Sequence, residues 1–352
     1  MKGKATSFDI AYQAGVSQST VSRALRGSTL VSLDTRRKIQ AIAKQLNYKV
    51  DKNASNLRRQ HSVTLALLLF EDPTSDDSLI NPFFLSMLGS ITRACGLQGY
   101  DLLVSFQQQS DDWHSDFQDS HKADGLILLG YGDYLVARSK LRKLEEQGTH
   151  FVRWGAVVEG QPGLSVGCDN LQGGRAVTEH LLNLGRKRIG FIGNITDRFP
   201  EFRDRYDGHV EALTAARIAR DPALQVDAVD STEQVGFRAM QELLASQVEL
   251  DAVFAASDLL AIGAMQALAA AGLRVPENVS VVGFDDLPIA SYTAPALTTV
   301  TQNAKLAGEI LVDRLLKQIR GEPAESAMLS AEVVIRRSCG AHAPPSADRA
   351  WQ

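Results

Sequence analysis

The sequence has few cysteines and no long hydrophobic segment. Its three cysteines, Cys95, Cys168 and Cys339, are scattered along 352 residues, so they fit neither a disulfide framework nor a metal-binding spacing. No apolar run reaches the roughly 20 residues of a membrane-spanning helix. The N-terminus, MKGKATSFDIAYQAG, lacks the apolar core of a signal peptide. We therefore expect a reduced, cytoplasmic protein without a membrane partner.

The sequence motifs of common catalytic sites are also missing or incomplete. GLSVG (163–167) matches the Gly-x-Ser-x-Gly elbow of hydrolases, but that motif needs a strand directly before it and a helix directly after it. Here EGQP precedes it and CDN follows it. GYGD (130–133) lacks the third glycine of a dinucleotide loop, and the chain has no phosphate-loop Gly-Lys-Ser/Thr and no metal-spaced His pair. We expect no catalytic residues, no metal and no cofactor, so the protein is not predicted to be an enzyme.

Charge is divided unevenly along the chain, although 44% hydrophobic and 22% charged residues are ordinary for two or three globular domains. Residues 1–62 hold 12 Lys and Arg against 3 Asp and Glu, a net charge of +9. The rest holds 25 against 38, a net charge of −13, which returns the total of −4. A small basic segment on an acidic body indicates a polyanionic partner. The alternative is a charged surface that only meets water.

Residues 1–50 have the spacing of three short helices. The first covers 6–15, and Gly15 permits the positive φ of a tight turn. Ser17 can cap a second helix that runs to about Leu25, and a third is expected over 32–47. Two short helices, a tight joint and a supporting helix are typical of a helix-turn-helix.

The second helix has an unusually polar outer face for its length. It carries Gln18, Ser19, Ser22 and Arg23, and its N-terminal turn adds the hydroxyls of Ser17 and Thr20. Such a helix fits the DNA major groove, where Gln can pair with adenine, Arg with guanine, and Ser or Thr with several bases or a phosphate. The alternative is a helical domain whose polar face only meets water.

Residues 51–62 form a short polar segment with two open interpretations. Asp51 can cap a helix whose few apolar residues include Ala54 and Leu57. It is too short to be stable alone in water. It is either a flexible linker or a hinge that folds on DNA, with Leu57 wedged between base steps in the minor groove.

From residue 63 the pattern changes to apolar runs of strand length separated by helical patterns. The runs include VTLALLLF (63–70), DLLVSF (101–106), ADGLILLG (123–130), HFVRWG (150–155), RIGFIG (188–193), DAVFAAS (251–257) and VSVVGFD (279–285). This alternation predicts an α/β fold with two doubly wound parallel sheets. A ligand is then expected at the C-terminal strand ends, in the cleft between two lobes.

Aromatic and charged side chains follow the predicted strand ends and helix starts. The candidates are Phe83, Phe84, Arg153, Trp154, Arg203, Arg205, Asp258, Asp285 and Gln302. Sugars need this mixture, because aromatic rings cover C–H faces while Asp and Arg bind vicinal hydroxyls by paired hydrogen bonds. Phe83 and Phe84 could instead be plain core, and Asp258 could be a helix cap.

DIAYQAGVSQSTVSRALRG, VSLDTRRKI and LNYKVDKNASNL resemble the lactose-repressor and purine-repressor family of bacterial regulators, and the resemblance runs to about Cys339. It implies a periplasmic-sugar-binding-protein-like body. It also implies that Gln18, Ser19, Ser22 and Arg23 face bases, that Ser17 and Thr20 contact phosphates, and that Leu57 intercalates beside Ala54. By the same resemblance Arg205 and Asp285 match effector-binding positions, and Phe83, Phe84 and Gln302 match other contact positions.

The sequence departs from the family pattern at several positions. Val50 and Asp51 stand where Pro-Asn is usual. Arg153 stands where relatives often carry an acidic residue, and Ser231 where several place an aromatic platform. These departures predict a pocket that is more cationic and wider on one side.

The expected organisation is a DNA-binding domain over 1–50, a hinge over 51–62, a body over 63–340 and a disordered tail over 341–352. Within the body we expect one lobe at about 63–163 plus 293–322 and another at 164–292 plus 323–340. We expect a transcriptional repressor that binds a palindromic double-stranded operator as a homodimer or tetramer and responds to a small effector, a sugar or sugar derivative. The alternatives are an activator on the same scaffold, or a solute-binding protein with an accessory head.

Overall fold

The structure is a computed structural model that describes residues 5–25, 27–48, 61–70, 80–107, 111–130, 132–158 and 160–341. The chain divides into two compact units, Met1–Ser62 and Val63–Gln352, which we call the head and the body. The positions Ala54 and Leu57 of the expected hinge lie outside the described residues, as does the tail beyond residue 341.

The head contains three helices around a small core of its own. They are α1 (Ser7–Ala14), α2 (Gln18–Leu25) and α3 (Leu33–Gln45). Thr6 and Asp9 form a reciprocal capping box at the start of α1. Gly15 ends that helix with φ 70° and makes the tight joint to α2. The three predicted helices are therefore present, and their core is formed by Ile10, Ala11, Ala14, Val21, Ala24, Val31, Ile39 and Ala43.

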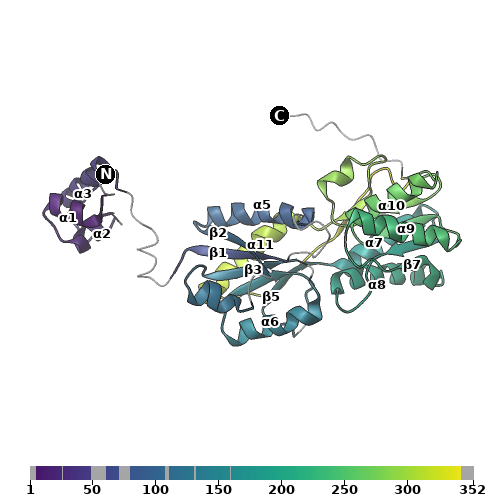
Figure 1. The fold of residues 1–352 in the computed structure, drawn as a ribbon, viewed down its shortest axis with the longest axis horizontal. Coiled ribbons are helices and arrows are strands. Elements are labelled where there is room, and N and C mark those ends of the chain that lie inside the picture. The colour runs from purple at the N-terminus through teal and green to yellow at the C-terminus, as the bar shows by residue number, and fades with distance from the viewer. Residues whose placement is uncertain are drawn as a thin grey trace. The chain divides into compact units, whose positions relative to one another are not determined.

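The body begins with a six-stranded sheet in which every pairing is parallel, in the order β11-β5-β4-β3-β1-β2. Its strands are β1 (Thr64–Leu69), β2 (Asp101–Phe106), β3 (Gly125–Leu129), β4 (Phe151–Trp154), β5 (Leu164–Cys168) and β11 (Ala327–Leu329). Four of the predicted apolar runs thus supply neighbouring strands of one sheet, β1 to β4. Both faces of this sheet are covered by helices, as expected for parallel strands (Figure 1).

Alternate residues of β1 enter two different hydrophobic cores. Leu65, Leu67 and Leu69 join the core that contains α5 (Pro82–Leu97) and α11 (Ala304–Ile319). Ala66 and Leu68 face the opposite core, which contains α6 (Tyr134–Glu146) and the short π-helical segment η2 (His114–Asp119). The period of two places successive side chains on opposite faces. Helices cover both faces of the sheet (Figure 1), and the residues of this apolar run are buried on both sides.

The second sheet has four parallel strands in the order β7-β6-β8-β9. They are β6 (Ile189–Ile192), β7 (Gln225–Val226), β8 (Ala252–Ala255) and β9 (Ser280–Val282). Two helix pairs pack on it: α7 (Asn170–Asn183) with α8 (Pro200–Ala215), and α9 (Glu233–Ala245) with α10 (Asp258–Ala270). Short turns η3 (Pro222–Leu224) and η4 (Pro288–Ser291) complete this part. The predicted pair of doubly wound sheets is therefore correct.

Two strands, β5 and β11, belong to the first sheet, although the expected lobe boundaries place them in the second lobe. β5 pairs with β4, and β11 pairs with β5, so residues 164–168 and 327–329 belong to the first sheet and not to the second lobe. A separate antiparallel pair, β10 (Thr299–Thr301) with β12 (Glu332–Val334), forms a third, two-stranded sheet. The expected boundary at residue 163 is wrong, because the first sheet continues through β5. GLSVG has no strong apolar run, so its sequence does not predict a strand.

The same strand excludes the nucleophile elbow. Ser165 lies inside β5 and not at a strand-to-helix turn. Its hydroxyl is 2.8 Å from the Arg153 Nε that donates to it. A buried serine in mid-strand, bonded to arginine, has neither the exposure nor the base that this motif supplies.

Candidate functional site

In the head, the N-terminal turn of α2 is organised by serine. The Ser17 hydroxyl accepts from Thr20 N at 3.2 Å and lies within 2.9 Å of the hydroxyls of Ser19 and Thr20. Ser17 therefore caps α2, as predicted from the sequence. The cap satisfies the Thr20 N–H, while a helix N-terminus retains further unpaired N–H groups and the positive end of the helix dipole, which favour an anion.

The remaining candidates on α2 differ in their surroundings. Ser19 and Arg23 are exposed, whereas Val21 and Ala24 on the other face are buried. Gln18 Nε2 donates to Ser7 Oγ at 2.7 Å, so only part of that amide is free to face a ligand. The described surface of α2 is therefore polar and carries a cation, with its apolar side committed to the core.

In the body, a buried arginine stands at the centre of the candidate site. Arg205 on α8 is fully buried. Its Nε donates to Asn170 Oδ1 at 2.8 Å, and its Nη1 donates to the Ala256 carbonyl at 2.5 Å. The guanidinium lies over the rings of Phe284 and Phe202, with Cζ 3.9 and 4.8 Å from the ring centroids. These contacts fix the orientation of its planar donor fork.

Asp285 and Gln302 complete this cluster. The Arg205 Nη1 lies 3.6 Å from Asp285 Oδ1, and Gln302 Nε2 donates to the same oxygen at 2.5 Å. Burial raises the pKa of Asp285 to about 6, although Arg205 and Gln302 both act to lower that pKa. Asp285 also has φ 115°, a strained backbone for a residue with a side chain. Strain of this kind concentrates at functional sites.

Two polar atoms of this cluster are buried without a partner among the described residues. They are Arg205 Nη2 and Gln302 Oε1. Leaving such a group unpaired costs about 1–3 kcal/mol, more if it is charged. One is a donor and the other an acceptor, and both flank Asp285. The cluster therefore lacks the hydrogen-bonding partner that a hydroxylated ligand supplies.

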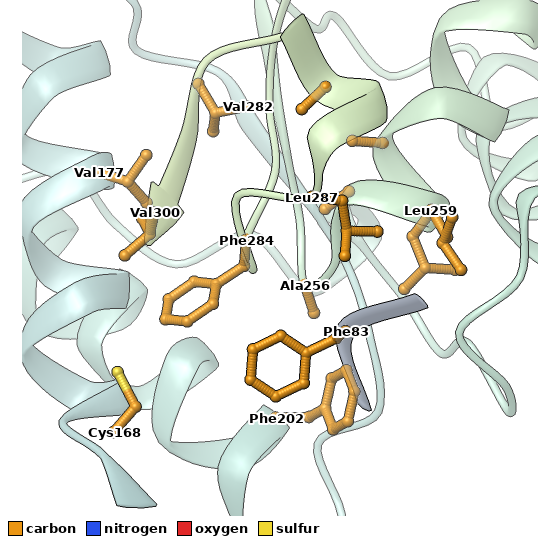
Figure 2. Packing of buried hydrophobic residues seen from close by; sticks show 14 of the residues in the cluster. Phe83, Cys168, Val177, Phe202, Ala256, Leu259, Val282, Phe284, Leu287 and Val300 are labelled. Carbon is orange, nitrogen blue, oxygen red and sulfur yellow. The ribbon is translucent and has the colours of Figure 1, made fainter. Parts of the chain in front are cut away.

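A hollow of about 250 Å³, which we call the interlobe hollow, lies beside this cluster. Its walls come from both sheets: Phe70, Asn81, Phe84, Gly130, Asp133, Asn194, Phe199, Phe202, Ala228, Val229, Asp230 and Ser231. Arg205, Asp285 and Gln302 do not line it. Phe202 connects the two, because its ring is a wall of the hollow and is also the ring below the guanidinium. Figure 2 shows Phe83, Phe202 and Phe284 converging on this region.

Arg153 and Trp154, at the end of β4, line a second hollow of about 200 Å³ beneath α6. Arg153 Nε donates to Ser165 and its Nη2 donates to the Ala156 carbonyl at 2.9 Å. Burial lowers the pKa of Arg153 from its usual value, and nearby Glu201 acts to raise it. The expected cationic side of the pocket is therefore balanced by an acid from α8.

Two predicted site residues, Asp258 and Phe83, do not line either hollow. Asp258 is fully buried and accepts from Leu287 N at 2.7 Å and from the Thr299 hydroxyl at 2.5 Å, so its two oxygens are used within the protein. Ser257, not Asp258, caps α10. Phe83 packs in the core against Trp154, with ring centroids 5.7 Å apart, whereas Phe84 lines the interlobe hollow.

Arg203 does not join the cluster. It is exposed and pairs with Asp197 and with Asp207 on the same helix. Residues 203 and 205 are separated by about 200° around an α-helix, so one faces solvent when the other is buried. This geometry removes Arg203 from the candidate site.

Several wall residues were not predicted from the sequence. Phe70 follows β1, Asn194 follows β6, and Asp230 follows β7. They stand at the C-terminal ends of parallel strands, which is where ligands bind in such folds. Phe70 and Asn194 could have been predicted as Asp285 was, because each lies at the C-terminal end of an apolar run of strand length. Asp230 follows a two-residue strand that has no sequence signal.

The described part of the chain has neither a metal-binding cluster nor a membrane-spanning helix. No group of three or more His, Cys, Asp or Glu side chains there is placed to hold a metal ion. No helix there combines the length and the apolar character needed to cross a membrane.

Comparison with known proteins gives two family matches. Residues 8–51 match the bacterial regulatory proteins of the lacI family. Residues 178–339 match the periplasmic binding protein-like domain. The first match covers the three head helices, and the second covers most of the second sheet with the polar cluster.

Similar proteins extend these matches over nearly the whole chain. The HTH-type transcriptional regulator CelR of Thermobifida fusca is 33% identical over 94% of this chain and 96% of its own. The ribose operon repressor of Escherichia coli K12 is 30% identical over 90% of this chain and 93% of its own. The structure of a Lac repressor dimer bound to operator is 26% identical, with a TM-score of 0.82 over 96% of this chain and 99% of that one.

A structure of a CelR–cellobiose complex is 31% identical, with a TM-score of 0.70 over 95% of this chain and 99% of that one. The helix-turn-helix head, the two parallel sheets and relatives aligned from end to end agree. The chain belongs to the LacI family of bacterial regulatory proteins.

Proposed function

We propose that this protein is a sugar-responsive transcriptional repressor. The head binds a palindromic double-stranded operator, and the body binds a carbohydrate effector beside Arg205, Asp285 and Gln302. The observation that carries the effector half is the pair of buried, unpartnered atoms, Arg205 Nη2 and Gln302 Oε1. Vicinal hydroxyls of a sugar can accept from the first and donate to the second.

The DNA half rests on α2 and on the charge of the head. Ser19 and Arg23 are exposed on this helix, Ser17 caps it, and residues 1–62 carry a net charge of +9. In a helix-turn-helix such a helix contacts base edges in the major groove while its N-terminal turn contacts phosphate. A solute-binding protein has no use for this second unit, which argues against that alternative.

Dimerisation and location follow from the palindromic operator. A protein with twofold symmetry presents two recognition helices to two half-sites, and a related Lac repressor is a dimer on its operator. Operator DNA of a bacterium lies in the cytoplasm, so this is where the protein acts.

Coupling between sugar and DNA requires that the sugar binds one conformation of the body more tightly than another. The polar cluster joins three parts of the body: Asn170 and Arg205 come from the α7–α8 pair on the second sheet, Asp285 follows β9 of that sheet, and Gln302 follows β10 of the two-stranded sheet. A ligand that bonds to all of them fixes these elements relative to one another. That is a differential contact of the kind that shifts a conformational equilibrium.

The test is an operator titration of the full chain with and without sugars, using fluorescence anisotropy of DNA from the promoter of its own gene. Sugar should change operator affinity in the wild type. Arg205→Ala should bind operator normally and lose the response to sugar. Arg205→Lys keeps the charge but not the planar donor fork, so it should lower the affinity for sugar by about tenfold or more. Arg203→Ala, on the same helix but exposed, is the matched control and should respond normally.

Different results would overturn different halves of the proposal. A normal sugar response of Arg205→Ala and Arg205→Lys would exclude the cluster as the effector site. An operator-bound protein that raises transcription in a reporter strain would replace repressor by activator.

A further inference from the structure

The hollow beneath α6, called the α6 hollow from here on, is not used by the effector site proposed above. Three residues line both hollows, Phe70, Gly130 and Asp133. The two spaces therefore meet at the ends of β1 and β3, and a ligand that fills one can extend into the other.

We propose that the α6 hollow is a second effector subsite that takes one uncharged sugar ring, so that the effector is a disaccharide or a longer saccharide. This inference rests on the proposed function, because it assumes that the first ring binds in the interlobe hollow beside Arg205. It adds the size and the chemical class of the ligand.

The volume of the α6 hollow fits one ring. A cavity of about 150 Å³ is enough to hold benzene, and the α6 hollow provides about 200 Å³. The interlobe hollow, at about 250 Å³, is likewise the size of one ring with its substituents. A monosaccharide would fill only one of these two spaces.

The walls of the α6 hollow suit a sugar more than a purely apolar group. Phe70, Trp113 and Tyr134 supply aromatic rings, which cover the C–H faces of sugars. The Trp113 indole N–H is already used, because it donates to the Gln107 carbonyl at 3.0 Å. Lys140 Nζ lies 5.3 Å from the centroid of the Trp113 ring, and Arg153 Cζ lies 5.3 Å from that of the Tyr134 ring. A sugar ring would therefore stack on Phe70 or on the remaining faces of these two rings.

Polar ends are available at one side of the hollow. Arg153 uses Nε and Nη2, and Glu201 Oε1 accepts from Ala156 N at 2.8 Å. Among the described residues, no hydrogen bond is found for Arg153 Nη1 or for Glu201 Oε2. One donor and one acceptor beside aromatic walls match the hydroxyls of a sugar ring.

The occupant is uncharged because the charges around the hollow are already balanced. The charge of Glu201 acts to raise the pKa of Arg153, Asp133 Oδ2 pairs with Arg198 at 3.3 Å, and Lys140 pairs with Asp111 at 3.1 Å. An ionised ligand group would add an unpaired charge beside the buried Arg153 and Glu201, which is costly.

The test uses isothermal titration of the full chain with matched sugars: glucose, galactose and ribose against cellobiose, maltose, trehalose and lactose. We expect one disaccharide to bind at least about tenfold more tightly than either of its component monosaccharides, since a second buried ring contributes at least one factor of ten. A component monosaccharide that binds as tightly as the best disaccharide would overturn the inference.

The matched variants lie on α6. Ala137 lines the hollow, on the same helix face as buried Leu141, so Ala137→Leu fills it with a helix-compatible side chain. This variant should lose the disaccharide advantage and keep monosaccharide affinity, which also shows that it is folded. Ser139→Leu, at an exposed position of the same helix, should behave as wild type.

The outcomes separate the two proposals. Unchanged disaccharide affinity of Ala137→Leu, or an equal loss for both sugar classes, overturns the second subsite and leaves the first. If the wild type binds no sugar of the panel, the proposed carbohydrate effector is wrong, and the second subsite is overturned with it.

Discussion

Asp285 combines three features that are unfavourable for stability. It is buried, its backbone has a positive φ, and its carboxylate is ionised at neutral pH against a desolvation cost that raises its pKa to about 6. Arg205 and Gln302 offset only part of this cost. A residue retained under such conditions indicates that binding, rather than folding, requires the carboxylate.

The first prediction follows from this conflict between stability and binding. The folded pKa of Asp285 exceeds its ordinary value of 3.8. Folding is therefore favoured by the protonated form, and the contribution of Asp285 to stability falls as pH rises from about 4 to above 6. Asp285→Asn mimics the neutral form, and asparagine tolerates a positive φ. At pH 7.5 this variant should be more stable than wild type by an amount on the order of 1–3 kcal/mol.

Urea unfolding at pH 7.5 and at pH 4.5 checks the sign. The difference in the free energy of unfolding between variant and wild type should shrink at pH 4.5. At this pH Asp285 is protonated in the folded chain and partly protonated in the unfolded chain. Arg205 keeps its bonds to Asn170 and Ala256 in the variant. If Asp285→Asn is instead strongly destabilised at pH 7.5, the Arg205–Asp285 pair is net stabilising and the ionised Asp285 does not oppose folding. In either case effector affinity should fall by about tenfold or more.

The second prediction concerns Arg23, which is exposed on α2. Its removal should cost about 1–3 kcal/mol at the cognate operator and relax the preference at one base position, because a guanidinium bonds to the edge of guanine by two hydrogen bonds. Binding to a library of operators with each base position randomised measures both effects. Lys44→Ala, which removes an exposed cation from α3, is the control and should weaken all sequences alike. A uniform loss for Arg23→Ala would assign Arg23 to phosphate.

At the scale of elements, glycines allow the helix pairs of the second sheet to approach closely. A Cβ on Gly174 of α7 would overlap the Arg205 carbonyl of α8, and a Cβ on Gly263 of α10 would overlap the Glu233 carbonyl of α9. These neighbours are backbone atoms, which cannot rotate away. The helices must then move apart, so the position of Arg205 depends on Gly174.

The third prediction uses these two glycines as a pair. Gly174→Ala and Gly263→Ala should each lower stability by about 1–3 kcal/mol, the usual cost of overpacking. Only Gly174→Ala should also weaken sugar binding, because it displaces the backbone that carries Arg205. Thermal unfolding and sugar titration of both variants test this. Equal sugar affinity in the two variants would show that α7 and α8 separate without moving the guanidinium.

At the scale of the whole molecule, the head and the body are separate compact units with separate cores. The fourth prediction is that a chain of residues 63–352 keeps sugar affinity and loses specific operator binding.

Operator affinity of the full chain should fall by about 10³-fold or more between 50 and 200 mM salt, because several Lys and Arg displace counterions from DNA. Filter binding over a salt series measures this slope. A salt-independent affinity, or specific operator binding by residues 63–352, would contradict the assignment of DNA binding to the head.

Much of the fold was predictable because it depends on local sequence patterns. The continuous apolar run that became β1, the Gly15 joint and the Ser17 cap each depend on fewer than ten neighbouring residues. Such signals report backbone preference and amphipathic period, which act over one or two turns of chain. They sufficed for the fold class, for the strands carrying apolar runs and for the helix-turn-helix.

The tertiary structure alone decided which of the candidate side chains meet. Arg205 and Asn170 are 35 residues apart, and Gln302 and Asp285 are 17 apart, so no local pattern links them. Arg203 and Arg205 look equivalent in sequence, yet helix phase sends one to solvent and one to the core. The sheet membership of β5 and β11 and the meeting of two hollows at Phe70 depend on strand order. Strand order is set by the burial of surfaces from distant segments, whereas local sequence patterns establish only which segments have surfaces to bury.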